Sequence, residues 1–350
     1  MKMAPEDQVI LITGASGFLA SHIVDYFLRA GYQVRGTVRS VETARKVQQA
    51  FSGYAQQLTL AVVEDVATPG AFDTAVRDVH GVIHTATPFQ VFGVEDNVRE
   101  LLKPAIDGTL NILKSVHEFA PQVKRVVLTS SFAAMADVTK GKWPGHVYSE
   151  LDWNPTPYEV AAAKGAPAGL AYTTAKSLAE RAAWDFVKSN KANFDITTIL
   201  PPMIYGPNIN ATANIAKLNT SSMDVYRLIS PQSKSSDPVP ENVFWSFVDV
   251  RDVAEAHLRA YQVAEAGGER FFICKGNFTY QQFVNALRAN LPEIKDRVPV
   301  GNPSAAEVPS DVYTVDTSKS QRILGLKYRP LEETIVDAAR SLLQLEAKSV

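Results

Sequence analysis

Short apolar runs alternate with amphipathic segments over the first 200 residues of the chain. Runs with strand character lie at residues 9–12, 33–38, 58–63, 81–86, 125–130 and 195–200. Helical periodicity follows the first run and returns over residues 94–119 and 172–189. Fully apolar strands are typical of a parallel sheet that is covered on both faces. Strand–helix alternation with right-handed crossovers therefore predicts an α/β fold with a doubly wound, Rossmann-type parallel sheet.

This regular pattern stops twice. Residues 137–169 and 208–242 are irregular and rich in proline, glycine or asparagine, and helices are predicted again over 250–262 and 331–345. We expect a second, smaller, interleaved α/β lobe. The predicted division gives residues 1–200 plus 246–262 to the nucleotide-binding lobe and 201–245 plus 263–350 to the substrate lobe. The alternative for the final helix is that it packs back on the first core. A long irregular segment in a compact domain is often a cover over a site.

Composition excludes several classes of function. The 350 residues carry a net charge of -2, which gives no reason to expect nucleic acid or an anionic membrane as a partner. One cysteine, Cys274, permits no internal disulfide and is expected to be a buried, inert thiol. The six histidines lack metal-ligand spacing, so no metal site is expected. Without a signal segment or a membrane-length apolar run, the expected compartment is the cytoplasm.

A glycine motif directly follows the first predicted strand and precedes a helix. Its spacing is Gly14-x-x-Gly17-x-x-Ala20, which departs from the commoner Gly-x-Gly-x-x-Gly. Such a turn lets the backbone approach a pyrophosphate, which then lies at the positive end of the helix dipole. The candidate cofactor contacts here are Gly14, Ser16, Gly17, Phe18 and Leu19. The alternative is a strand-to-helix turn that binds no ligand.

The end of the second strand indicates which nucleotide is bound. NAD-binding folds usually place an acid there for the ribose 2′-hydroxyl, whereas this chain has Arg39. A guanidinium can pair with a 2′-phosphate, so the sequence favours NADPH over NADH. The alternative is that Arg39 merely extends into solvent.

Two further strand ends supply candidate cofactor contacts. After the third strand, Asp65 and Val66 could hold the adenine edge, or Asp65 could simply cap a turn. After the fourth strand, the small residues Thr85, Ala86 and Thr87 lie where the nicotinamide half would pass.

A tyrosine and a lysine four residues apart form the candidate catalytic group. Tyr172 and Lys176 share one face of a helix that follows the fifth strand, and Ser130 and Ser131 end that strand. A nearby ammonium and an oxidised nicotinamide are expected to lower the pKa of the tyrosine, which can then protonate a nascent alkoxide. A serine hydroxyl would stabilise the developing negative charge, and Lys176 would also hold the cofactor ribose. The alternative is a helix with a buried tyrosine and an exposed lysine.

The run of motifs resembles the extended short-chain dehydrogenase/reductases. Similar segments cover nearly the whole chain: residues 13–20, 65–66, 84–86, 128–131, 172–176, 201–207 and 247–254. Within that family the chain is most similar to fungal NADPH-dependent aldehyde and ketone reductases of the methylglyoxal type and to plant dihydroflavonol reductases. The signature of the cinnamoyl-CoA reductases is missing, so a CoA thioester substrate is not expected.

The resemblance implies roles for individual residues. It implies Ser131 as the active serine, Tyr172 as acid/base, Lys176 as ribose anchor, Arg39 as phosphate binder and Pro201 beside the nicotinamide. Two positions depart from the related branch. Thr43 stands where a second basic residue is common, and Met203 stands where relatives have a tyrosine. The sequence leaves open whether Ser130 or Ser131 faces the substrate.

Apolar residues that follow the strands predict a hydrophobic substrate pocket. They are Phe89, Phe92, Phe132, Met203 and Ile204. We therefore expect NADPH-dependent reduction of a hydrophobic aldehyde or ketone to the alcohol, by a monomer or homodimer. Two alternatives stay open: an epimerase or dehydratase of the same fold that retains NAD, and a dinucleotide sensor without catalytic activity.

Overall fold

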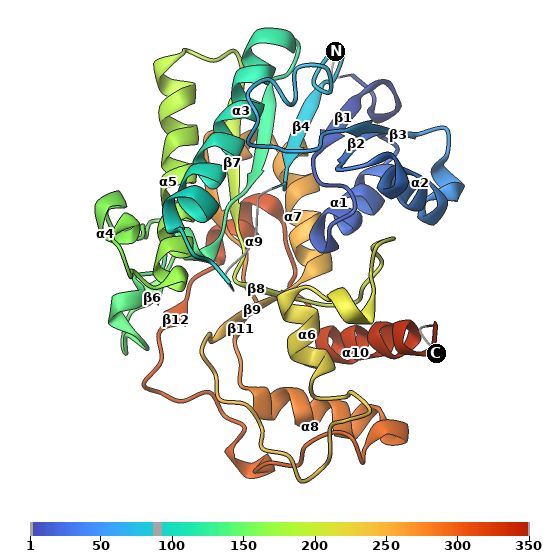
Figure 1. The fold of residues 1–350 in the computed structure, drawn as a ribbon, viewed down its shortest axis with the longest axis vertical. Coiled ribbons are helices and arrows are strands. Elements are labelled where there is room, and N and C mark those ends of the chain that lie inside the picture. Colours follow the sequence, from blue (N-terminus) through green and yellow to red (C-terminus); the bar gives the residue numbers. More distant parts are fainter. Residues whose placement is uncertain (1–2, 87–92, 349–350) are drawn as a thin grey trace.

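A seven-stranded parallel sheet forms the centre of the larger, upper part of the molecule in Figure 1. The computed structural model describes residues 3–86 and 93–348. The strand order is β10-β7-β5-β4-β1-β2-β3, and every neighbouring pair is parallel. The strands are β1 (Val9–Ile12), β2 (Gln33–Val38), β3 (Leu58–Val62), β4 (Gly81–His84), β5 (Arg125–Thr129), β7 (Asp195–Leu200) and β10 (Arg270–Phe272). This order, with helices on both faces, confirms the predicted doubly wound sheet.

Side-chain alternation along the strands builds a core on each face of this sheet. In β1, Ile10 and Ile12 pack with α1 (Phe18–Arg29) and α7 (Val250–Gln262). Leu11 points the other way, into a core made with α3 (Lys103–Phe119) and α5 (Ala168–Ser189). Figure 1 shows these two helix pairs on opposite sides of the sheet. Both faces are thus apolar, as the continuous hydrophobic runs predict.

Two small sheets and a separate helical core are built mainly from the second half of the chain. A three-stranded sheet has the order β11-β9-β8, and β6 pairs with β12. These strands are β6 (Val147–Tyr148), β8 (Met203–Tyr205), β9 (Ser246–Asp249), β11 (Gly276–Asn277) and β12 (Thr314–Val315). A separate core joins α6 (Thr220–Tyr226), α8 (Tyr280–Asn290) and α10 (Leu331–Lys348). The two-lobe division stays a prediction; β10, within residues 263–350, pairs with β7 in the large sheet.

The remaining helices are short or lie at the periphery. They are α2 (Val41–Ala50), α4 (Tyr158–Ala162) and α9 (Ser318–Leu324). Helices α4 and α6 interrupt the two stretches that the sequence marks as irregular. Within the described residues, no helix combines the length and apolarity that crossing a membrane requires.

Helix α5 begins earlier than the sequence pattern predicts. Its first residue is Ala168, after Pro167 in an extended conformation, so Tyr172 lies in the second turn and not at the start of the helix. Proline at the helix entrance fixes φ and lacks only an N–H that the first turn does not use. A π-helical segment, Val98–Leu102, similarly precedes α3 within the predicted helix over 94–119.

Candidate active site

The glycine turn lies between the ends of β2 and β4. Gly14 has φ of +71°, a conformation that favours glycine, and its N–H donates to Thr37 Oγ1 at 3.1 Å. A Cβ at Gly14 would lie 3.3 Å from the Cβ of Ala86. The turn therefore touches two of the strand ends that the sequence singles out.

Thr13, which the sequence reasoning missed, fastens this turn to the end of β4. Its fully buried Oγ1 accepts hydrogen bonds from the N–H groups of Thr85 and Ala86, each at 3.0 Å. The same oxygen lies 3.0 Å from Nδ1 of His84. Threonine directly after an apolar strand is the signal that could have found it. These bonds hold residues 85–86 beside the glycine turn.

Helix α1 starts at the glycine turn without a capping side chain. Gly17 is the N-cap residue, is exposed, and offers no side-chain acceptor to the first turn. Ser16, Phe18 and Leu19 are half-buried around it. Exposed backbone N–H groups at a helix start suit an anion such as a diphosphate.

Arg39 is exposed just past β2, and the described residues give its guanidinium no ion-pair partner. Asp65, by contrast, already caps a turn. Its Oδ1 accepts a hydrogen bond from the Ala67 N–H at 2.9 Å, which agrees with the alternative that Asp65 caps a turn. The Val66 carbonyl accepts from Asn111 of α3 at 3.2 Å, which anchors that loop to the helix. Thr87 lies outside the described residues.

Three consecutive hydroxyls at the end of β5 have three different partners. Thr129 lies 2.7 Å from Nε2 of His257, and since His257 Nδ1 lies 2.7 Å from the Val253 carbonyl, the threonine is the donor in the neutral tautomer. Ser130 donates to Glu180, whereas Ser131 is hydrogen-bonded to Tyr172. Ser131 is thus the serine that faces the tyrosine.

Burial sets the protonation of the Tyr172–Lys176 pair. Burial raises the pKa of Tyr172 to about 12, although the bond from Ser131 lowers it. Burial lowers the pKa of Lys176 to about 8, against the charge of Glu180, which raises it. Burial and Ser131 account for the shift without a contribution from Lys176, so the expectation that the ammonium and an oxidised nicotinamide together lower the tyrosine pKa stays a prediction.

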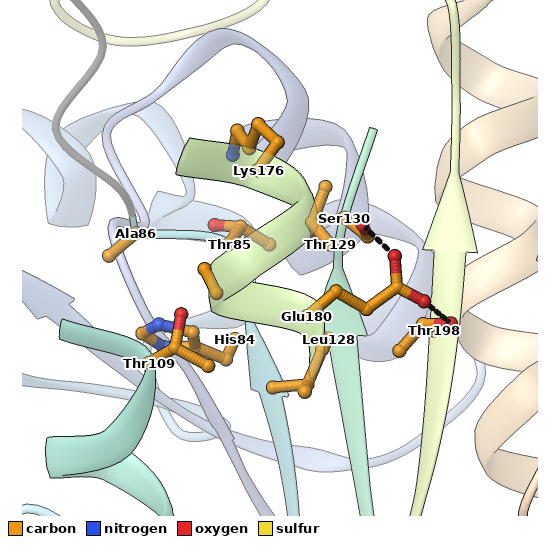
Figure 2. Close-up of a pocket in the computed structure, with 11 residues that line it drawn as sticks. His84, Thr85, Ala86, Thr109, Leu128, Thr129, Ser130, Lys176, Glu180 and Thr198 are labelled. Atoms are coloured by element: carbon orange, nitrogen blue, oxygen red, sulfur yellow. Dashed lines mark hydrogen bonds between the residues drawn. The ribbon is translucent and has the colours of Figure 1, made fainter. Parts of the chain in front are cut away.

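A cavity lies beneath Lys176, between α3, α5 and the ends of β4 and β5 (Figure 2). Its lining includes His84, Thr109, Ser130, Lys176 and Glu180. His84 is neutral there, since burial lowers its pKa to about 3. Sequence reasoning missed Glu180, yet the spacing Tyr172, Lys176, Glu180 repeats every four residues and places all three on one face of α5.

The predicted substrate pocket is only partly described. Phe132 is buried, with its ring 5.5 Å from that of Phe272 and 4.9 Å from that of Tyr148, so it packs in a core cluster, and its role in a pocket wall stays a prediction. Met203 and Ile204 are half-buried; Met203 packs against the core of α6, α8 and α10, and Ile204 packs against the core of α1 and α7. Their positions follow from alternation along β8.

Two other predicted pocket residues, Phe89 and Phe92, lie outside the described residues. Pro201, the candidate neighbour of the nicotinamide, is buried, and its carbonyl accepts from the Phe132 N–H at 2.9 Å. Over residues 3–86 and 93–348, no cluster of three or more His, Cys, Asp or Glu has the arrangement of a metal site. Cys274 is buried, and burial raises the pKa of its thiol to about 12.

Comparison with known proteins identifies similar chains. A family model described as "NAD dependent epimerase/dehydratase family" matches residues 10–274. The chain is 38% identical over 339 residues to "Ketoreductase azaE" of Aspergillus niger, covering 96% of this chain and 97% of that relative. It is 37% identical over 349 residues to "NADPH-dependent methylglyoxal reductase GRE2" of Saccharomyces cerevisiae, covering 97% and 99%. "Cinnamoyl-CoA reductase CAD2" of Medicago truncatula is 37% identical over 337 residues, covering 95% of each chain.

The fold also matches a solved structure. The crystal structure of yeast methylglyoxal/isovaleraldehyde reductase Gre2 complexed with NADPH superposes with a TM-score of 0.89 at 36% identity. The match covers 97% of this chain and 100% of the yeast chain. The similarity therefore extends over both regions of the molecule.

Proposed function

The chain belongs to the NAD dependent epimerase/dehydratase family, and within it we propose that the protein is an NADPH-dependent reductase of hydrophobic aldehydes or ketones. The observation that carries this proposal is the hydrogen bond between Ser131 and Tyr172, with Lys176 one helical turn further on. These groups lie at the carboxyl edge of the sheet, where doubly wound proteins bind their ligands. Relatives named as NADPH-dependent reductases support the same reaction.

The nucleotide-binding residues fit NADPH. Gly14 and the uncapped start of α1 leave room and N–H groups for a diphosphate. The exposed guanidinium of Arg39 suits a 2′-phosphate. We infer that Thr85 and Ala86 border the nicotinamide half and that Lys176 holds its ribose hydroxyls.

Reduced nicotinamide, when bound, supplies the hydride for the carbonyl carbon. Ser131 donates a hydrogen bond to the carbonyl oxygen as negative charge develops there. Tyr172, whose pKa is about 12, carries its proton at neutral pH and transfers it to that oxygen, since an alkoxide is the stronger base. Lys176, with a pKa of about 8, is mostly protonated at pH 7 and offers its N–H groups to the ribose.

Incubation of purified protein with NADPH and a panel of carbonyl compounds tests this function. The panel contains aliphatic and aromatic aldehydes, ketones and one CoA thioester, because one relative is named as a cinnamoyl-CoA reductase. Oxidation of one NADPH per alcohol formed is the expected result. Conversion of a substrate without net cofactor change would instead indicate the epimerase or dehydratase reaction that the family's name includes, and binding without conversion would indicate a sensor.

The same proposal includes the cytoplasm as compartment and a monomer or homodimer as the assembled state. Fractionation of the source cells checks the first, and light scattering of the purified protein checks the second. Neither bears on the chemistry at Tyr172.

A further inference from the structure

We propose that Glu180 is a positioning residue that holds the Ser131–Tyr172–Lys176 group in register by tying helix α5 to three neighbouring strands. The inference rests on the proposed reductase function. Glu180 itself touches neither substrate nor cofactor in this proposal; it acts through Ser130 and Lys176.

The carboxylate of Glu180 is a buried hub, with 1% of its side chain exposed. Its Oε2 accepts from Ser130 at the end of β5, and its Oε1 accepts from Thr198 of β7 at 2.8 Å (Figure 2). Nε of Arg270, at the start of β10, donates to Oε1 at 2.7 Å. One helix side chain thus contacts three adjacent strands of the large sheet.

Arg270 extends the same network to the irregular segment after residue 137. Its Nη1 donates to the carbonyls of Glu150 and Asp152, the latter at 2.9 Å. Its guanidinium lies 3.6 Å from the ring centre of Trp153. The buried Glu180–Arg270 ion pair therefore connects the catalytic helix to the predicted cover segment.

The Glu180 carboxylate is connected to the catalytic group by two routes, through Ser130 and through Lys176. Ser130 precedes Ser131, so a shift of the Ser130 hydroxyl moves the backbone that presents Ser131 to Tyr172. Glu180 also lies one helical turn beyond Lys176, and its charge favours the protonated amine. A buried ion pair is weak evidence for stability, yet it imposes a single geometry on what surrounds it.

The groups that face Lys176 come from several elements. Glu180 lies on its own helix, His84 faces it from β4, and the remaining residues of the lining, Ser130 and Thr109 among them, are uncharged. His84 is neutral, and Arg270 lies on the far side of Glu180. Glu180 is therefore the charged side chain of this lining that stabilises the ammonium, and its loss should lower the pH at which Lys176 loses its proton.

Glu180→Gln tests the role with a matched control. The control, Asp195→Asn, breaks the Arg125–Asp195 ion pair, in which Nε and Oδ1 lie 2.7 Å apart. Both residues begin their strands, β5 and β7, at the edge of the sheet away from the catalytic group. We expect Glu180→Gln to lower kcat for carbonyl reduction about 10-fold or more and to shift the alkaline limb of its pH profile to lower pH, while Asp195→Asn changes neither. If the two variants have equal kcat and equal pH profiles, Glu180 has only a structural role and the inference is wrong.

Competitive acetylation of Lys176, read by mass spectrometry, measures the lysine pKa without turnover. A pKa that falls in Glu180→Gln but not in Asp195→Asn supports the inference even if the wild-type protein reduces no carbonyl, in which case only the proposed function fails. An unchanged lysine pKa contradicts it.

Ser130→Ala is the second variant, because it removes one link and leaves the Glu180–Arg270 pair intact. A lower kcat with an unchanged dissociation constant for NADPH supports the positioning route. An unchanged kcat overturns it, even if Glu180→Gln fails to fold.

Discussion

Replacing Arg39 with alanine should separate NADPH from NADH. Arg39 stands at the point where a dinucleotide fold contacts the adenosine ribose, and no acid is present there to bind a 2′-hydroxyl. We expect Arg39→Ala to weaken the binding of NADPH strongly and the binding of NADH hardly at all.

The expected size follows from the position of the side chain. The Gly14 N–H reaches Thr37 at 3.1 Å, and Arg39 lies two residues further along the same strand direction, about 6–7 Å at ~3.3 Å per residue. A hydrogen bond to a charged group contributes about 1.5–3 kcal/mol, and two in a bidentate pair contribute more. Because Arg39 is exposed, we take about 2–3 kcal/mol of binding free energy for the whole contact. Its loss should raise the dissociation constant for NADPH roughly 30- to 150-fold.

Fluorescence titration of both reduced cofactors at one ionic strength measures the effect. Arg45→Ala is the control, since Arg45 is also exposed and its removal takes the same charge from the neighbouring helix α2. We expect that control to change either affinity by less than about fivefold, the range of a surface charge in water. Equal losses for NADPH and NADH, or equal losses in the two variants, would refute recognition of the phosphate by Arg39.

Three further predictions concern the catalytic acid and the core. Tyr172→Phe should lower kcat about 100- to 10,000-fold and leave the dissociation constant of NADPH nearly unchanged; rapid turnover would exclude the acid role. Gly36→Ala would place a Cβ 2.7 Å from that of Ala15, and should lower the free energy of unfolding by about 1–3 kcal/mol in urea titrations, whereas Gly53→Ala, with nothing within 4 Å, should not. Burial lowers the pKa of His257 to about 4, so its stabilising contribution is present above the unfolded value of 6.5 and is lost as pH falls. From pH 7 to pH 5 the wild type should therefore lose about 2 kcal/mol more stability than His257→Gln, and parallel losses in urea titrations would contradict a neutral buried imidazole.

Local patterns were enough to predict the sheet and the chemistry at its edge. Continuous apolar runs require burial on both faces, so the alternation of such runs with helices leaves few arrangements. The spacing of Tyr172 and Lys176 places them on one helix face in any fold that keeps the helix. Arg39 was predicted to bind the 2′-phosphate in the same way, because a strand end has a defined place in a doubly wound sheet.

Contacts between distant segments were decided only by the tertiary structure. Glu180 and Arg270 are 90 residues apart, and no local pattern says that their side chains meet behind Ser130. The same holds for Phe132, whose apolar character suits a pocket wall as well as a core, and which neighbouring rings place in the core. The pKa of Tyr172 likewise depends on how much water the packed chain excludes, a quantity that sequence spacing does not contain. Short-range patterns thus determined the strands, the helices and the candidate catalytic residues. Which serine, acidic and aromatic side chains contact one another depended on packing across the sheet.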